Sequence, residues 1–415
     1  MIASKDQTKK RVAEFPGAHC GLMEASVMAP LFPNSISIVV APPSCSFHAK
    51  LVASRRLLST SRKDDRLFCL NLSQEDLIFG VEPLLEETLQ ELDDLFQPEL
   101  IFVISTCTPE IIGFDASALT LLREQLHAKV VVVPTNGYES LHQQKGSIDF
   151  LCSLVEVMKR KETIPQSVNI LGLRSMDLEE VEYIRVLEEA GITINALLPG
   201  AEHLSEIENA PNAALNIVVS KIALPLAKKM EETFRIPYLW ADFSYKTEQI
   251  VKGYEKIVQF FDLPLPDVVE RLREEHKQFI EEKRKSLQGV SFAIGSVKGS
   301  NIEAAAFYAE LGMVPKFITT RMPASGNDLN LQEIRDRGFD CPVIQLERGM
   351  KMKDFLQRYR PQIFIGHAQS ELLKQENVLH CHPIMHRSGP GFAAIQQELE
   401  NMTDLIQCGK DMKII

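Results

Sequence analysis

The chain has no long uninterrupted apolar run. A helix that crosses a membrane needs roughly 18 consecutive apolar residues, and no stretch of the sequence is that long. Residues 1–11 are polar and rich in lysine, without the apolar core of a secretion signal. The sequence therefore predicts a cytoplasmic protein with no membrane partner.

An excess of positive charge is also missing. The 45 Lys and Arg residues are outnumbered by 56 Asp and Glu residues, which gives a formal net charge of −11. Domains that bind nucleic acid usually concentrate Lys and Arg on one face. The charge balance argues against a nucleic-acid partner, although it is compatible with a small basic patch that binds a partner protein.

The eight cysteines have neither the dense spacing of a small secreted domain nor any Cys-x-x-Cys pair. Scattered thiols in a reducing cytosol are structural, catalytic or metal-bound. Low-complexity tracts are absent too, and 45% hydrophobic with 24% charged residues is typical of a globular protein. The length of 415 residues predicts two or three domains, and we expect three.

Short runs rich in Val and Ile recur along the chain, each bounded by turn residues. Continuous apolar runs of this length fit buried parallel strands. Amphipathic segments such as 84–95 and 178–190 lie between many of them, and this alternation is typical of α/β layers. The predicted strands are 36–41, 100–105, 130–133, 168–171, 192–196, 215–219, 290–294, 317–319 and 362–365.

The α/β texture divides into three blocks, which we take as three domains. Residues 1–160 end at a charged break, and residues 161–288 end in a long, highly charged helix predicted over 267–287. Residues 289–415 form the third block. The predicted fold class is α/β with parallel sheets in three similar domains.

Three cysteines of the first block lie beside turns rich in small residues and proline. Cys45 follows the predicted strand 36–41 and Cys107 follows the strand 100–105, whereas Cys20 lies in a Pro-Gly-Ala-His-Cys-Gly stretch. Ligand sites gather at the carboxyl edge of a parallel sheet, and thiolates suit the soft iron of Fe–S clusters. A cubane needs four ligands, and this chain offers three. The alternative is that these cysteines are small buried packing residues.

Residues 105–115, Ser-Thr-Cys-Thr-Pro-Glu-Ile-Ile-Gly-Phe-Asp, resemble the strand-end motif of nitrogenase component 1 and its relatives. Further segments resemble the same family in the same order along the chain. They are 41–45, 76–82, 134–138 with Gly146, 168–172, 187–192, 214–218 and 388–391. The resemblance implies three Rossmann-like αβα domains of the nitrogenase component 1 type.

The resemblance also implies an iron–sulfur cluster in the first domain. In that family the cluster is a [4Fe-4S] or a larger P-cluster-like [8Fe-7S] cluster at a subunit interface, and a homologous component 1 subunit completes its ligands. Matched residue by residue, the ligands here are Cys20, Cys45 and Cys107. Other cysteines match no ligand position and are expected to be packing thiols; these are Cys69, Cys152, Cys341 and Cys408.

A second site is expected where the family holds a large metallocofactor between its domains with one cysteine and one histidine. Ser220 occupies the cysteine position, and a neutral hydroxyl is a poor ligand for soft iron. This argues against binding of the nitrogenase cofactor in the usual way.

The histidine side of that site is rich in candidate groups. Residues 380–386 read His-Cys-His-Pro-Ile-Met-His, in which His382 and His386 are the nearest matches to the family histidine. Cys381 is a candidate replacement for the missing cysteine. Imidazole is both a common metal ligand and a titrating group near neutral pH. His382 and His386, together with Cys381, are therefore the candidate catalytic residues. The candidate cofactor-binding residues are Ser220, Ser388 and Gly389.

A glycine-bearing loop at 295–301 separates a predicted strand from a predicted helix at 302–311. Its backbone amides suit an anion, although a plain βα turn explains the same residues. The Gly-Lys-Ser/Thr of an ATP-binding loop is not present at the required spacing.

The sequence leaves three functions to compare. The leading hypothesis is a subunit of a nitrogenase-like reductase, in a heterotetramer with a related chain, that takes electrons from a separate ATP-dependent Fe-protein-like reductase. Its relatives include tetrapyrrole reductases. The second is a scaffold on which an Fe–S cofactor is assembled, and the third is a degenerate subunit whose thiols bind nothing.

Overall fold

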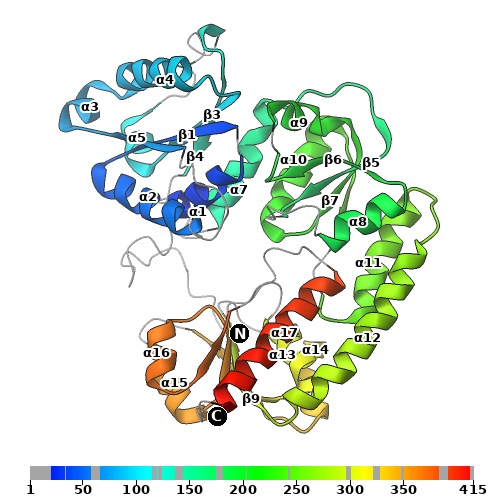
Figure 1. Ribbon diagram of the computed structural model, residues 1–415. Coiled ribbons are helices and arrows are strands. Elements are labelled where there is room, and N and C mark those ends of the chain that lie inside the picture. Colours follow the sequence, from blue (N-terminus) through cyan, green and yellow to red (C-terminus); the bar gives the residue numbers. More distant parts are fainter. Residues whose placement is uncertain are drawn as a thin grey trace, which may run out of the picture. The chain divides into compact units, whose positions relative to one another are not determined.

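The chain folds into three parallel sheets with helices packed on them (Figure 1). They are seen in a computed structural model that describes residues 20–32, 34–57, 66–114, 119, 124–135, 144–173, 181–201, 203–241, 244–295, 301–320, 328–346, 350–382 and 391–411. The parallel pairing confirms the predicted α/β class.

The first sheet has the strand order β2-β1-β3-β4. Its central strands β1 and β3 are buried along their whole length, which explains their uninterrupted apolar sequences. The strands are β1 (Ser35–Ala41), β2 (Leu67–Asn71), β3 (Leu100–Ser105) and β4 (Lys129–Pro134). The helices are α1 (Gly21–Met28), α2 (Pro43–Leu57), α3 (Gln74–Phe79), α4 (Glu82–Phe96), α5 (Cys107–Ile112) and α7 (Lys145–Ser153).

The second sheet has the order β6-β5-β7-β8. Its strands are β5 (Ile164–Leu171), β6 (Thr193–Leu198), β7 (Ala213–Val218) and β8 (Tyr238–Trp240). The helices of this region are α8 (Glu182–Glu189), α9 (Leu204–Asn209), α10 (Leu224–Phe234), α11 (Thr247–Phe260) and α12 (Asp267–Leu287). Short 3-10 turns in the chain lie at Ala29–Leu31, Leu154–Glu156, Ala210–Asn212 and Lys221–Ala223.

The third sheet has the order β11-β10-β9-β12-β13. Its strands are β9 (Ser291–Gly295), β10 (Val314–Thr320), β11 (Val343–Gln345), β12 (Ile363–Gly366) and β13 (Leu379–Cys381). Its helices are α13 (Asn301–Glu310), α14 (Leu329–Asp336), α15 (Met352–Tyr359), α16 (Ser370–Gln375) and α17 (Phe392–Asp411).

The chain forms two compact units. One comprises Met1–Met176 and Ile194–Leu239, and the other comprises Asp177–Thr193 and Trp240–Ile415. Helix α8 joins the second unit because the Glu182 carboxylate accepts hydrogen bonds from the Tyr254 hydroxyl and from the N–H of Phe392. The three sheets fall within the three predicted blocks, whose boundaries at 160 and 288 stay predictions.

Four of the described strands were not among those predicted from the sequence, and all four are short. The strands β2, β8, β11 and β13 have five residues or fewer and lie at or near sheet edges. Because β2 is partly exposed, it lacks the continuous apolar run that marked β1 and β3. In contrast, the helix predicted over 267–287 coincides with α12.

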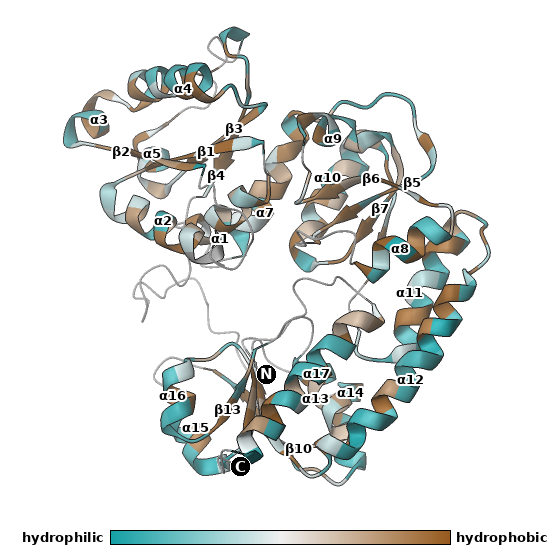
Figure 2. Cartoon of the chain, in the orientation of Figure 1, coloured by the Kyte–Doolittle hydropathy of each residue, from teal (hydrophilic) through white to brown (hydrophobic). Residues whose placement is uncertain are grey.

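Hydrophobic residues concentrate in the strands, whereas α12 carries hydrophilic residues along much of its length (Figure 2). Among the residues described, no helix is both long and apolar enough to cross a membrane.

A ladder of asparagine amides crosses the second sheet. The Nδ2 of Asn169 in β5 donates to Oδ1 of Asn216 in β7 at 2.8 Å and to the carbonyl of Ala210 at 2.7 Å. From β6, Asn195 Nδ2 donates to Asn169 Oδ1 at 2.8 Å. Asn169 and Asn216 are fully buried, so each amide depends on the others for hydrogen bonds that water cannot supply.

Replacing Asn169 with Ala should lower the free energy of unfolding by about 1–3 kcal/mol, because the amides of Asn195 and Asn216 lose their buried partner. Urea denaturation measures the change. Asn401→Ala is the matched control, since that amide also donates to a carbonyl, at 2.8 Å, but on an exposed helix face. Equal losses in the two variants would contradict the ladder's role.

Candidate iron–sulfur site

Each of the three predicted ligands stands at the start of a helix. Cys20 is the N-cap residue of α1, Cys45 lies in the first turn of α2, and Cys107 is the first residue of α5. The first N–H groups of a helix lack partners within it, and the helix dipole places positive charge there. This setting favours negative charge on a bound anionic cluster, although in the chain without metal the effect of burial on the pKa of Cys20 and Cys45 is larger.

The three thiols lie close enough to act on one another electrostatically. Burial raises the pKa of Cys20 and of Cys45, and the neighbouring Cys107 raises both further. Cys20 also adds to the raised pKa of Cys45. Like charges that oppose ionisation in this way are compensated when the thiolates bind cationic iron. The structure therefore brings the three predicted ligands together.

No three His, Cys, Asp or Glu side chains in the described ranges are arranged to hold one metal ion. This finding concerns single ions, around which all ligands converge on one centre. In a cubane each cysteine binds a different iron, so the sulfur atoms lie farther apart. The donor set, three partly buried thiols without a carboxylate among them, suits such a cluster.

Two buried threonines tie together the strand ends that carry the site. The Thr106 hydroxyl donates to the Val40 carbonyl of β1 at 2.8 Å, directly before Cys107. The Thr135 hydroxyl donates to the Ser105 carbonyl of β3, also at 2.8 Å. Both bonds cross between neighbouring strands at the carboxyl edge, so they fix the loops from which α2 and α5 begin.

Helix α1 is held against α7 by a contact between two glycines. A Cβ atom at Gly146 would lie 1.8 Å from the carbonyl oxygen of Gly21, the residue after Cys20. The Ser147 hydroxyl donates to Glu24 at 2.9 Å across the same pair of helices. Gly146, which lies in the family-like segments of the sequence, therefore allows the close approach that sets the position of Cys20.

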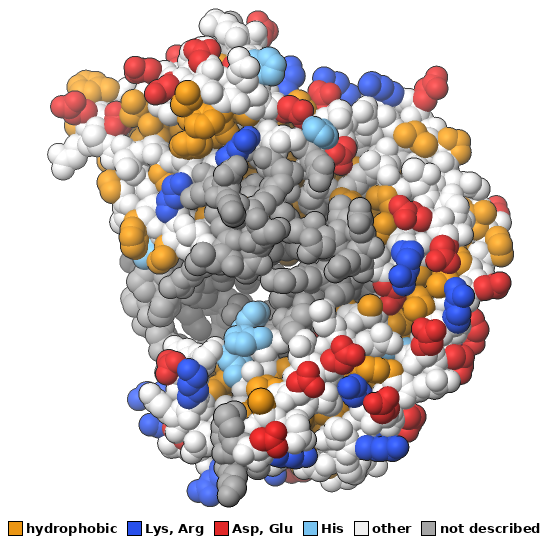
Figure 3. Space-filling model, in the orientation of Figure 1, with side chains coloured by type: hydrophobic (Ala, Val, Ile, Leu, Met, Phe, Trp, Pro, Cys, Tyr) orange, Lys and Arg blue, Asp and Glu red, His pale blue; other side chains and the backbone are white. Residues whose placement is uncertain are grey.

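Large apolar side chains are exposed on the helices around this edge. Phe47 of α2 is 64% exposed, Ile111 of α5 is 69% exposed and Phe79 of α3 is 83% exposed. Figure 3 shows hydrophobic side chains on the surface over the region of α3 and α4. Helices α2, α3 and α5 each follow a strand of the same parallel sheet. We refer to Phe47, Phe79 and Ile111 together as the apolar rim. Exposed apolar groups gathered at one edge are typical of an interaction surface.

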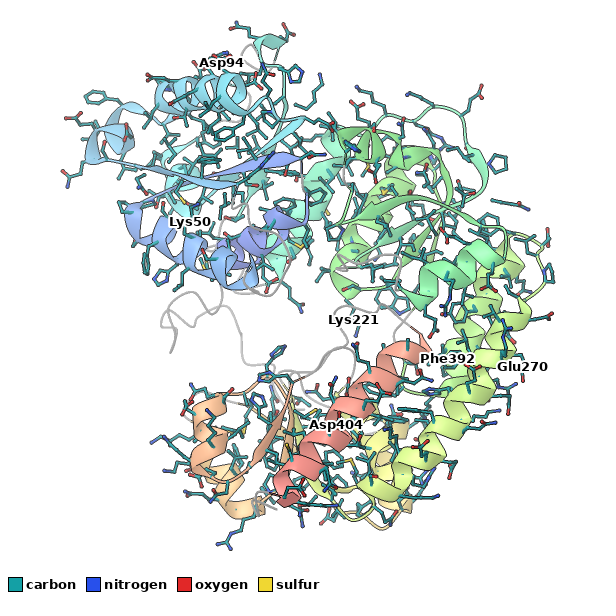
Figure 4. All side chains as sticks on the ribbon, in the orientation of Figure 1. Lys50, Asp94, Lys221, Glu270, Phe392 and Asp404 are labelled. Carbon is teal, nitrogen blue, oxygen red and sulfur yellow. The ribbon has the colours of Figure 1, made fainter. Side chains whose placement is uncertain are left out.

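Ser220, which the sequence resemblance predicts to replace a family cysteine, lies just beyond β7 and is half-buried. A Cβ atom on Gly172 would come within 2.7 Å of the Ser220 Cβ, and Gly172 has a φ of +95°. The serine thus packs directly against the end of β5, followed by the exposed Lys221, which is labelled in Figure 4.

The pleat of β13 separates Cys381 from its neighbouring histidines. The rings of His380 and His382 lie 3.7 Å apart between centroids, whereas Cys381 is only 3% exposed. Burial, with a contribution from Glu398, raises the pKa of Cys381 to about 12. A buried, protonated thiol on the opposite face favours packing over the ligand role suggested for Cys381. His386, Ser388 and Gly389 lie outside the described residues.

His380 is an orienting residue that the sequence did not single out. Its Nε2 lies 2.9 Å from the Gly366 carbonyl and its Nδ1 lies 3.1 Å from the Ser370 hydroxyl. Both nitrogens are therefore engaged, so His380 supports the exposed His382 rather than offering a free ligand atom. Burial lowers the pKa of His380, and His382 and His367 lower it further. His367, directly after β12, joins this group because β12 and β13 pair in parallel.

Gly146→Ala should destabilise the first unit by about 1–3 kcal/mol and displace α1, since the new methyl group overlaps the Gly21 carbonyl. Thermal unfolding and the rate of Cys20 alkylation measure the two effects. Gly253→Ala is the control, because nothing lies within 4 Å of its Cβ position. Unchanged stability in Gly146→Ala would contradict the glycine contact.

Comparison with known proteins places this geometry in context. Residues 20–395 match the model of the nitrogenase component 1 type oxidoreductase family. The nitrogenase iron-molybdenum cofactor biosynthesis protein NifE of Methanococcus maripaludis is 26% identical over 330 residues, covering 76% of this chain and 67% of that protein. The nitrogenase molybdenum-iron protein alpha chain of Methanosarcina barkeri is 25% identical over 296 residues, covering 68% and 55%.

The fold is similar to a solved structure of the same kind. Nitrogenase Cp1 at pH 6.5 superposes with a TM-score of 0.77 at 16% identity, covering 98% of this chain and 95% of that one. The family match spans most of the sequence, including all three predicted cysteine ligands. This chain belongs to the nitrogenase component 1 type oxidoreductase family.

Proposed function

We propose that this protein is the cluster-bearing subunit of a nitrogenase-like two-component reductase. In this role Cys20, Cys45 and Cys107 hold an iron–sulfur cluster. Electrons arrive from an ATP-dependent Fe-protein-like reductase and pass to a substrate or second metallocofactor between the domains. The observation that carries the proposal is the gathering of three thiols at three helix starts on one sheet edge.

The surrounding residues prepare this edge for a redox group. A bound Fe–S cluster supplies one-electron transfer. The chain's own part is to hold the thiolates at fixed positions, through the Thr106 bond to β1 and the glycine contact beside Cys20. Helix N-termini favour the negative charge of the thiolates, and partial burial limits the access of water.

A homologous partner subunit explains two features of the site together. The chain supplies three thiols where a cubane needs four ligands. The apolar rim of Phe47, Phe79 and Ile111 is exposed in the single chain, and Phe47 and Ile111 lie on the helices that carry Cys45 and Cys107. An interface at this edge would cover the rim and complete the ligand set, which supports a heterotetramer with a related chain.

An assembly scaffold is the second candidate. Ser220 stands at the position of the family cysteine that holds the large cofactor, and the similarity to NifE, whose name describes cofactor biosynthesis, favours this role. Both roles share the three-cysteine cluster. They differ in whether the metal group stays on the protein during turnover.

Cys107→Ala should remove most of the bound iron and sulfide, because the cluster loses one of only three ligands from this chain. The protein is purified anaerobically, and iron, sulfide and the EPR spectrum of the reduced state are measured. Cys408→Ala, which removes an exposed thiol on α17, should keep the full iron content. Full iron in Cys107→Ala would refute the ligand assignment.

Ile111→Asp should weaken subunit association by roughly tenfold or more, because a charge would be buried in the apolar interface next to Cys107. Anaerobic sedimentation of the protein expressed with its partner measures the association. Leu329→Asp is the control, since Leu329 of α14 is 79% exposed and lies outside the first sheet. An Ile111→Asp variant that assembles normally would exclude this edge as the interface.

Turnover separates the reductase from the scaffold. The complex is mixed with its Fe-protein-like reductase, ATP, an electron donor and a reducible substrate as the electron acceptor, and its metal content is followed over many reduction cycles. A reductase keeps its metal and oxidises the donor repeatedly, whereas a scaffold loses a metal group to an acceptor protein. Metal transfer without repeated donor oxidation would overturn the reductase assignment.

A further inference from the structure

A carboxyl group that forms no ion pair with any described residue is buried in the core beneath the third sheet. Glu398 of α17 is 1% exposed. The Tyr308 hydroxyl of α13 donates a hydrogen bond to its Oε1. Its Oε2 has no hydrogen-bond partner among the described residues. Such an oxygen is costly to bury as part of a carboxylate, because ionisation would place unpaired charge in an apolar interior.

Among the described residues, the groups that face Glu398 come from several elements, and none is a cation at neutral pH. Tyr308 comes from α13, Tyr245 from the segment before α11, with ring centroids 6.0 Å apart, and Cys381 from β13. Helix α12, which also packs on α17, carries the buried His276, whose ring lies against Phe392 at the start of α17. Burial lowers the pKa of His276 to about 4, so its imidazole is neutral.

Ion pairing therefore offers no route to stabilise a charged Glu398. Within the described residues no Lys, Arg or His forms an ion pair with its carboxylate, although Lys and Arg pair with other acids of the same unit, such as Glu333 and Glu248. The remaining way to bury this group is to keep it protonated.

We propose that Glu398 is a proton-storage site, which the folded protein holds as a neutral carboxylic acid and empties only as the pH rises through neutrality. On release the O–H bond breaks, the electron pair stays on the carboxylate and the proton passes to a solvent or buffer base. The new charge then weakens the packing of α17 on α13 and β13. This inference does not depend on the proposed function, because it concerns residues outside the cysteine site.

The sign of the pH effect follows from the burial of the acid. Burial raises the pKa of Glu398 from 4.5 to about 7, and the Tyr308 hydrogen bond opposes that rise. A carboxyl whose pKa is higher in the folded state contributes stability below about pH 4.5 that is lost as the pH rises to about 7. The unfolding equilibrium constant should increase on the order of 100-fold across this window from Glu398 alone.

Release at Glu398 also reaches the start of its helix. Phe392, the first residue of α17, is labelled in Figure 4. It donates its N–H to Glu182 at 3.0 Å and packs its ring 5.1 Å from that of His276. Helix α17 is continuous from Phe392 to Asp411. Weaker packing around Glu398 therefore also strains the contacts that Phe392 makes at the start of the helix. Protonation of Glu398 thus sets the stability of the packing of α17 against its neighbouring elements.

Infrared difference spectroscopy of the full-length chain detects the proton directly. Protonated carboxylic acids have a carbonyl stretch that ionised carboxylates lack. We expect one such band at about pH 6 that disappears by about pH 9. The band should be missing in Glu398→Gln and present in Glu400→Gln, which changes an exposed acid of the same helix.

Thermal unfolding gives an independent readout. Glu398→Gln, which mimics the neutral acid, should be more stable than the natural protein at about pH 9 and nearly equal at about pH 5. In Tyr308→Phe the release should move to higher pH, because the hydrogen bond that favours ionisation is lost. This second variant keeps the test open if Glu398→Gln does not fold.

Two outcomes would overturn the proposal. One is a natural protein that shows no protonated-acid band at about pH 6, which would mean that Glu398 is already ionised. The other is a band that persists in Glu398→Gln, which would assign the proton to another group. Neither result would bear on the iron content that tests the cysteine site.

Discussion

Parallel pairing of β1 with β3 is the constraint on which the candidate site depends. Parallel neighbours end at the same edge of the sheet, so the helices that follow them begin side by side. Cys45 and Cys107 occupy the first turns of α2 and α5, and the contact of α1 with α7 adds Cys20. Ligands separated by long stretches of sequence are thus brought together without a local binding loop.

Buried polar groups fix the positions of elements that apolar packing alone leaves free to slide. In the second sheet Asn169 links three strands through amide bonds, and in the first sheet Thr106 ties two strand ends. Glu182 caps the N-terminus of α17 through the N–H groups of Phe392 and Ala393. Each of these groups is satisfied by hydrogen bonds, whereas Glu398 retains an oxygen without one and is the group most sensitive to protonation.

The cysteine edge and the Ser220 region differ in how far they follow the family pattern. The three cysteines are partly buried thiols, a donor type that suits iron, and large apolar side chains are exposed on nearby helices of the same sheet. At the second position, where the sequence resemblance predicts a missing cysteine, Ser220 packs against Gly172. A chain with this combination can carry electrons or hold a cluster while binding the large cofactor, if at all, by other groups.

The sequence alone determined the α/β class, because β1 and β3 are buried on both faces and must be apolar throughout. It also predicted that Cys20, Cys45 and Cys107 are cluster ligands, from the turn residues and family-like motifs around them, and this assignment stays a prediction. Short strands such as β2 and β13 left no such signal, because sheet pairing rather than local composition forms them.

Only the tertiary structure separated Cys381 from His382, because strand pleating sends neighbouring side chains to opposite faces. The tertiary structure alone revealed that Glu398 is a buried acid. Its carboxyl group is removed from water only when α17 packs on α13, where it meets Tyr308. The sequence around a glutamate does not show whether its side chain will be buried.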